Sequence, residues 1–149
     1  MNLEKYALKA GEDLTIFEFI SEGPKGTIRK LIQFQETTEP GVYNLAFGDK
    51  SQVTGDIDDL AASNNGDTDK VLATVVAALY AFFDRYPDAF IYATGSTEAR
   101  TRLYRMGIIR FYQELQRDFY LFGQVGDDFQ KFENGTTTYK GFLAQRKFD

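Results

Sequence analysis

The fold is decided by residues 63–112, which read SNNGDTDKVLATVVAALYAFFDRYPDAFIYATGSTEARTRLYRMGIIRFY. We expect a first helix to begin at Asp67 or Thr68, because either residue can cap free N–H groups, and Asp69 adds favourable charge in the first turn. Apolar residues occupy most of its circumference over residues 71–83, which predicts a helix buried in the core. The charged residues at both ends leave an apolar run too short to span a bilayer.

The second half of this stretch predicts a short strand and an arginine-rich helix. Phe90–Ala93 has strand composition, and the Gly-Ser-Thr turn after it places Ser96 or Thr97 at the N-cap of a helix that continues to Tyr112. We expect one apolar stripe of this helix to face the core. The stripe consists of Ala99, Leu103, Met106 and Ile109.

The flanking regions are predicted to be strands separated by turns. The expected strands are Leu3–Lys9, Leu14–Ser21, Thr27–Glu36, Val42–Gly48 and Phe119–Val125. Asn134-Gly135 is a strong two-residue hairpin signal, so Phe129–Glu133 is expected to pair with Thr136–Gln145. Lys140, Arg146 and Lys147 would then protect an exposed edge.

This order of elements predicts an α+β fold. We expect a twisted, mainly antiparallel sheet with two principal helices packed on it. A chain of 149 residues is long enough for one core, so a single domain over residues 1–149 is expected. With no signal peptide or stop-transfer segment in the sequence, the expected location is the cytoplasm.

Two absent residue types narrow the chemistry. The chain has no His and no Cys, which excludes serine–histidine triads, cysteine nucleophiles, disulfides and the usual histidine-ligated zinc sites. Any catalysis would use carboxylates, Tyr, Lys, Arg, Ser, Thr or backbone groups. The 17 basic and 22 acidic residues give a net charge of −5, which argues against broad binding to nucleic acid or anionic membranes.

Two candidate sites precede the first helix, and each has a simpler alternative. Gly66, Asp67 and Thr68 form a candidate anion cradle, but an ordinary loop with a helix cap is common for this composition. Asp56, Asp58 and Asp59 could bind a divalent cation. Their spacing differs from the calcium-loop pattern, so we favour a solvated acidic loop and expect no metal.

The candidate ligand-binding group is Ser96, Thr97, Arg100 and Arg102. Backbone N–H groups are free at a strand-to-helix turn, and arginines one turn further on can grip a phosphate or carboxylate bidentately. The alternative is a capped helix whose arginines only pair with surface carboxylates. Tyr104 is a candidate general acid, against the alternative of an aromatic side chain at the edge of the core.

One resemblance covers most of the chain. It is carried by Asn44-Leu-Ala-Phe-Gly-Asp49, Ser63-Asn-Asn-Gly-Asp-Thr68, Gly95-Ser-Thr-Glu-Ala-Arg-Thr-Arg-Leu-Tyr104 and Tyr139-Lys-Gly-Phe-Leu143. These segments look like a bacterial family known only as a domain of unknown function. The resemblance implies a bacterial source and gives no chemistry.

The order of elements also resembles the core of the GNAT-superfamily N-acetyltransferases. In that family a loop with two small residues opens the central helix and binds the pyrophosphate of coenzyme A through backbone N–H groups. Gly66 matches the first small residue and Thr68 the second, and Tyr104 matches the general acid. This resemblance implies coenzyme A as a possible cofactor.

Three functions therefore remain open at this stage. The first is a binding module for a partner protein or for self-association, the second is an acyltransferase that uses coenzyme A, and the third is recognition of a phosphate-bearing ligand by the arginine-rich helix.

Overall fold

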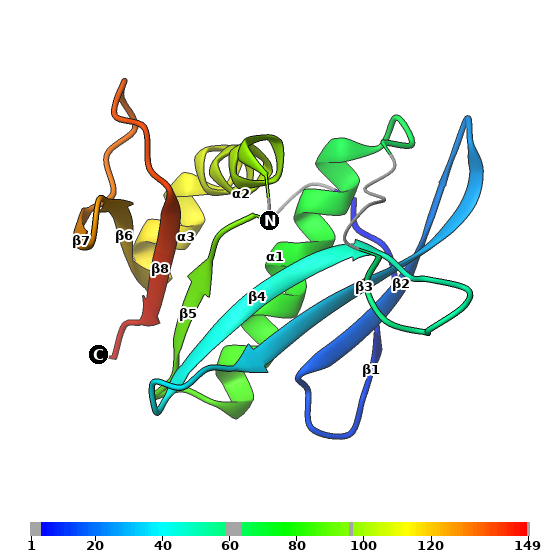
Figure 1. Cartoon of the computed structure of the whole chain (residues 1–149), viewed down its shortest axis with the longest axis horizontal. Coiled ribbons are helices and arrows are strands. Elements are labelled where there is room, and N and C mark those ends of the chain that lie inside the picture. Colours follow the sequence, from blue (N-terminus) through cyan, green and yellow to red (C-terminus); the bar gives the residue numbers. More distant parts are fainter. Residues whose placement is uncertain (1–3, 59–63, 96, 149) are drawn as a thin grey trace. The chain divides into compact units, whose positions relative to one another are not determined.

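The computed structural model describes residues 4–58, 64–95 and 97–148, and its elements are labelled in Figure 1. In chain order these are β1 (Lys9–Ala10), β2 (Ile16–Gly23), β3 (Gly26–Glu36), β4 (Val42–Asp49), α1 (Thr68–Arg85), β5 (Phe90–Ala93), α2 (Glu98–Arg110), α3 (Tyr112–Asp118), β6 (Phe119–Val125), β7 (Asp128–Lys131) and β8 (Gly141–Arg146). Hydrogen bonds order the strands β1-β2-β3-β4-β5-β8-β6-β7. The only parallel pair among the described ladders joins β4 and β5. The α+β prediction of a mainly antiparallel sheet with two principal helices is confirmed.

The chain divides into two compact units, each of which is described by itself. The N-terminal unit comprises Asn2–Phe34 and Ala46–Arg85, and the C-terminal unit comprises Gln35–Leu45 and Tyr86–Asp149. The division therefore falls within β3 and β4. The expectation of one domain over residues 1–149 stays a prediction.

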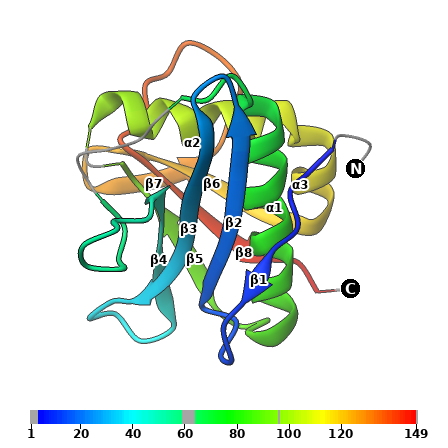
Figure 2. The same cartoon turned by 90° about the vertical axis from the view of Figure 1, so that its right-hand side faces the viewer.

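Helix α1 forms the core of the N-terminal unit, as predicted. Half of its residues are buried, and Phe82 is fully buried with its ring stacked on that of Phe34 at 4.4 Å between centroids. Phe83 meets Phe82 edge to face at 5.6 Å. Figure 2 shows this helix behind β2. Over the described ranges, no helix combines the length and apolar character that crossing a bilayer requires.

A hairpin of β2 and β3 supplies the sheet of the N-terminal unit. The two strands pair from Ile16↔Gln33 to Gly23↔Gly26, so Pro24 and Lys25 form a two-residue loop, and Gly26, the first residue after it, has a φ of +90°. Lys30 interrupts the alternation of the sequence yet is buried. Its ammonium lies 2.8 Å from the Asp49 carboxylate, which compensates the charge.

The predicted strand Leu3–Lys9 begins at a residue that lies outside the described ranges, and over residues 4–8 the prediction is wrong. In the described part of this segment, only Lys9–Ala10 pairs with β2. The Tyr6 N–H instead donates to the hydroxyl of Thr74 on α1, at 2.8 Å. The hydroxyl of Thr74 therefore accepts the Tyr6 N–H, which in a strand would donate to a carbonyl of the neighbouring strand.

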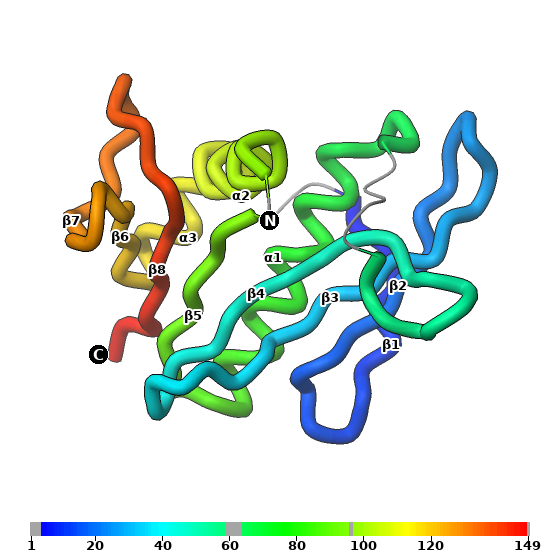
Figure 3. The backbone as a smooth tube through the Cα atoms, in the orientation of Figure 1, coloured from blue at the N-terminus to red at the C-terminus, as the bar shows by residue number. Residues whose placement is uncertain are grey.

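In the C-terminal unit, β8 lies between β5 and β6 and pairs antiparallel with both (Figure 3). The predicted hairpin of Phe129–Glu133 with Thr136–Gln145 is therefore wrong. Asp128–Lys131 pairs with β6 instead, through a two-residue turn in which Gly126 has a φ of +61°. Because β8 has a neighbour on each side, Lys140, Arg146 and Lys147 do not protect an edge.

Contacts of the segment after β7 explain why the Asn-Gly signal fails. The guanidinium of Arg105 donates to the carbonyls of Gly135 and Thr137, each at 2.7 Å. Phe132 and Tyr139 are buried and pack against Phe142 of β8. Two aromatic anchors and one arginine thus hold the segment in a path that a hairpin would not follow.

The face of α2 that meets the core also differs from the prediction. Ala99, Met106 and Ile109 are exposed, and Leu103 is half-buried. The packed residues are Tyr104, Gly107, Ile108 and Phe111, which follow the spacing i, i+3, i+4, i+7. The aromatic rings and the small Gly107 define the contact face, and α2 ends at Arg110, before the short helix α3.

Candidate functional site

The loop that enters α1 contains the predicted anion cradle. Gly66 has a φ of +74°, and its N–H donates to the side-chain oxygen of Asn64 at 2.9 Å. The buried Asn65 side chain accepts the N–H of Lys25 at 2.7 Å and donates to the carbonyl of Gly26 at 2.9 Å. These bonds tie the loop to the turn between β2 and β3.

The Asp67 carboxylate has partners within the N-terminal unit. One of its oxygens accepts the hydroxyl of Tyr6 at 2.5 Å and the hydroxyl of Ser21 at 2.6 Å. Burial raises the pKa of the Tyr6 hydroxyl, and its hydrogen bond to Asp67 raises that pKa further. With the Gly66 N–H already paired and a carboxylate alongside, this geometry resembles an ordinary helix-entry loop and fits a pyrophosphate poorly.

The acidic loop gives no metal centre in the part of the chain that the structure describes. No group of three or more potential ligating side chains gathers among residues 4–58, 64–95 and 97–148. Asp59, one of the three carboxylates considered from the sequence, lies outside these ranges.

Tyr104 lies at the end of the parallel β4–β5 ladder. Its hydroxyl donates to the carbonyl of Leu45 at 3.2 Å, and Leu45 forms the last ladder pair with Ala93. The Tyr104 ring packs against the cluster of Phe132, Tyr139 and Phe142. The side chain is therefore part of the core edge, with its hydroxyl directed at the point where the ladder stops.

The N-terminus of α2 is built as the sequence predicts. Thr97 is the N-cap, and its hydroxyl accepts the N–H of Arg100 at 3.2 Å. Ser96 lies outside the described residues. Gly95 packs so closely on the first turn that an added Cβ would lie 2.4 Å from the Cβ of Arg100, which explains a glycine at this position.

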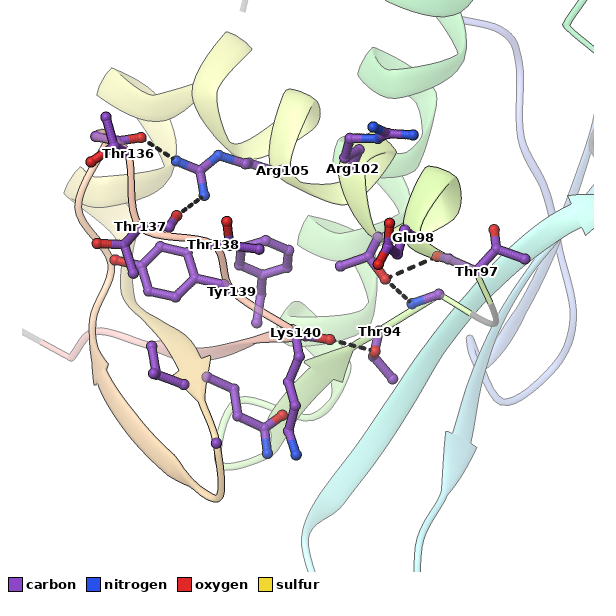
Figure 4. A pocket seen from close by; sticks show the side chains of 17 residues that line it. Thr94, Thr97, Glu98, Arg102, Arg105, Thr136, Thr137, Thr138, Tyr139 and Lys140 are labelled. Atoms are coloured by element: carbon purple, nitrogen blue, oxygen red, sulfur yellow. Dashed lines mark hydrogen bonds between the residues drawn. The ribbon is translucent and has the colours of Figure 1, made fainter.

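A pocket of about 770 Å³ opens beside this helix end, within the C-terminal unit. Its walls come from the end of β5, the first two turns of α2, the β6–β7 turn and the segment before β8 (Figure 4). The lining residues are Thr94, Gly95, Thr97, Glu98, Thr101, Arg102, Arg105, Gln124, Val125, Gly126, Gly135, Thr136, Thr137, Thr138, Tyr139, Lys140 and Phe142. Of the candidates from the sequence, Thr97 and Arg102 meet here.

Two cations of this pocket, Arg105 and Lys140, are not among the site residues that the sequence predicts. Arg105 bridges from α2 to the carbonyls of Gly135 and Thr137 and lies over the rings of Phe132 and Tyr139, so it fixes one wall (Figure 4). Lys140 precedes β8, and its carbonyl accepts the hydroxyl of Thr94 at 2.7 Å. No local motif marks either residue, because only the tertiary fold brings them to the helix end.

The described lining residues carry three cations, Arg102, Arg105 and Lys140, against the single carboxylate of Glu98. Fold and pocket together define an α+β domain with a hydroxyl-rich, cationic pocket beside a helix N-terminus. The chain belongs to the Family of unknown function (DUF6934), whose model matches residues 2–147.

This match confirms the resemblance to a family known only as a domain of unknown function. Neither the curated proteins nor the solved structures give a match. The similarity to the GNAT-superfamily N-acetyltransferases stays a prediction.

Proposed function

We propose that this protein is a binding module whose pocket takes a small ligand with an anionic group. The observation that carries the proposal is the net positive charge of the residues that line the pocket. Three cations and one carboxylate line it, in a chain whose net charge is −5. Local positive charge in an acidic chain favours a phosphate or carboxylate at this position over the rest of the surface.

One of the three cations stabilises the pocket wall, and the other two can contact a ligand. Arg105 already donates to two carbonyls and holds the wall. Arg102 is exposed on α2. The Lys140 side chain is more than half exposed, and its ammonium lies 3.7 Å from the carboxylate of the fully exposed Asp127 side chain, a contact that contributes little in water.

The remaining lining fits a polar, hydroxyl-bearing or phosphate-bearing body. Six threonines contribute hydroxyl groups, which both donate and accept hydrogen bonds. The volume lies within the range of pockets that enclose small molecules. A binding role requires only these groups, whereas the chain has neither His nor Cys for the usual nucleophilic chemistry.

Arg102→Gln and Lys140→Gln are each expected to weaken binding of an anionic probe by about 10-fold, as loss of a charge-assisted hydrogen bond does. Ribose 5-phosphate at millimolar concentration serves as the probe, with calorimetry and thermal unfolding as readouts. The affinity is expected to fall as salt is raised.

Arg117→Gln is the matched control, because this exposed arginine of α3 does not line the pocket. The control should bind as the unmodified chain does. The proposal is abandoned if inorganic phosphate, ribose 5-phosphate and citrate all fail to bind, or if both pocket variants bind them unchanged.

The second candidate is acyl transfer from an acyl-coenzyme A, and one observation favours it. The Tyr104 hydroxyl, the general acid that the GNAT resemblance assigns, lies at the end of the parallel β4–β5 ladder. The entry loop of α1 argues the other way, because the Gly66 N–H is paired and Asp67 would repel a pyrophosphate.

Calorimetry with acetyl-coenzyme A separates the two candidates. If the second holds, the titration gives heat, an amine panel gives turnover, and Tyr104→Phe lowers that turnover by about 100-fold while the fold persists. Absence of both heat and thermal stabilisation at millimolar ligand removes it.

A further inference from the structure

One face of the sheet in the C-terminal unit is not covered by the helices of that unit. Helices α2 and α3 pack through Tyr104, Ile108 and Tyr112 on the face that contains Phe142 and its cluster. Side chains alternate along a strand, so the neighbours of these core residues point to the opposite face.

Tyr92 of β5 lies flat across the open face. A Cβ added to Gly141 of β8 would lie 2.7 Å from the Tyr92 hydroxyl and 2.8–2.9 Å from two of its ring carbons. The hydroxyl reaches the side-chain oxygen of Gln124 on β6, at 2.5 Å. The ring therefore starts on β5, crosses β8 above a glycine and is anchored on β6, with one side against the sheet.

The ring of Phe129 on β7 stands nearly perpendicular to the Tyr92 ring, and the two rings together form an aromatic corner. Its centroid lies 6.1 Å from that of Tyr92, and the two planes meet at 85°. The Phe129 side chain is 43% exposed. One ring thus forms a floor and the other a wall, and an incoming planar group could stack on the floor while it touches the wall.

The chemistry of the open face favours an uncharged planar ring. The register places on it Phe90, Tyr92, Tyr120, Phe122, Gln124, Phe129, Lys131, Gly141, Leu143 and Gln145. None of these ten residues is a carboxylate, although the chain has 22 acidic residues. Aromatic rings stack on nucleobases in a sequence-tolerant way, and neighbouring amide groups can form hydrogen bonds with the edges of the bases.

The corner is continuous with the cationic pocket. Gln124 anchors Tyr92 and also lines the pocket, and Lys140 lines the pocket immediately before Gly141. We propose that the ligand is a nucleoside phosphate, with its base stacked on Tyr92 and its phosphate at Lys140, in the positive potential that Arg102 adds to the pocket. This inference rests on the proposed anion-binding function and names the ligand class of that site.

The test compares three probes on the full chain by calorimetry: adenosine 5′-monophosphate, ribose 5-phosphate and adenosine. The monophosphate is expected to bind about 10-fold more tightly than ribose 5-phosphate, because a stacked base adds roughly that factor. Tyr92→Leu should remove this difference and leave the affinity for ribose 5-phosphate unchanged.

Two variants control for the fold and for aromatic content. Tyr92→Phe keeps the ring and should retain most of the preference for the monophosphate. Tyr120→Leu removes a different aromatic ring from the same face. The Tyr120 ring lies under the Lys147 ammonium, at 5.2 Å from its centroid, and this variant should bind all three probes as the unmodified chain does.

The outcomes separate the two proposals. Equal affinity for the monophosphate and ribose 5-phosphate in the unmodified chain overturns the nucleoside assignment and leaves anion binding in place. Binding of adenosine as tight as that of the monophosphate overturns the phosphate-binding role of the pocket. A preference for the monophosphate that survives in Tyr92→Leu overturns the corner as the stacking site.

Discussion

Phe82→Ala is expected to lower the free energy of unfolding by about 3–5 kcal/mol, the usual loss for a buried aromatic ring. The side chain is fully buried, stacks on Phe34 and meets Phe83 edge to face. The substitution removes these contacts and leaves a cavity between α1 and the hairpin of the same unit. Denaturant titration with circular dichroism measures the loss directly.

Phe148→Ala is the matched control, because this phenylalanine is 62% exposed. We expect a change within about 0.5 kcal/mol, as for surface substitutions in general. A loss at Phe82 no larger than that of the control would mean that α1 is not the core of its unit.

Gly123→Ala is expected to destabilise the protein by about 1–3 kcal/mol through overpacking. A Cβ at this position would lie 2.3–2.6 Å from three atoms of the buried Tyr139 ring, and that ring is held between Phe132 and Phe142. The ring therefore cannot move without disturbing its cluster. Thermal and denaturant unfolding both measure the effect.

Gly135→Ala is the natural comparison for this substitution. No heavy atom outside its chain neighbours lies within 4 Å of an added Cβ at this site, and its φ is not in the left-handed region. Its stability should stay close to that of the unmodified chain. Equal stability of the two variants would show that the Tyr139 ring does not occupy the space above Gly123.

The elements that the sequence predicts well are those with strong local signals. Helix α1 carries an apolar surface, an Asp-Thr pair typical of helix starts and a proline shortly after its end. The β2–β3 hairpin is marked by a Gly-Pro-Lys-Gly turn. In both cases the local preference and the tertiary packing agree, so no knowledge of distant residues is needed.

The errors occur where distant residues decide the path. Asn134-Gly135 is a good turn in isolation, but Arg105 captures the carbonyls of this segment and the cluster around Tyr139 holds its side chains. On α2, two helical stripes compete, and the choice depends on which one can fill the space beside Phe142. Neither outcome is encoded in a window of ten residues.

The candidate site shows the same division. Thr97 and Arg102 are predictable because a strand-to-helix turn and an arginine one turn later are local features. Lys140 and Tyr92 join them only because the last strand inserts between two earlier ones. Tyr92 in particular looks like an ordinary strand aromatic until Gly141 is placed beneath it.

The central position of β8 has a consequence for biosynthesis. Strands β5 and β6 have no shared partner until residues 141–146 leave the ribosome, so the C-terminal unit cannot close its sheet during translation of the preceding sequence. Its edges stay open in the nascent chain for that interval, and such edges attract other chains. Termination of translation before Gly141 would therefore yield a product prone to aggregation.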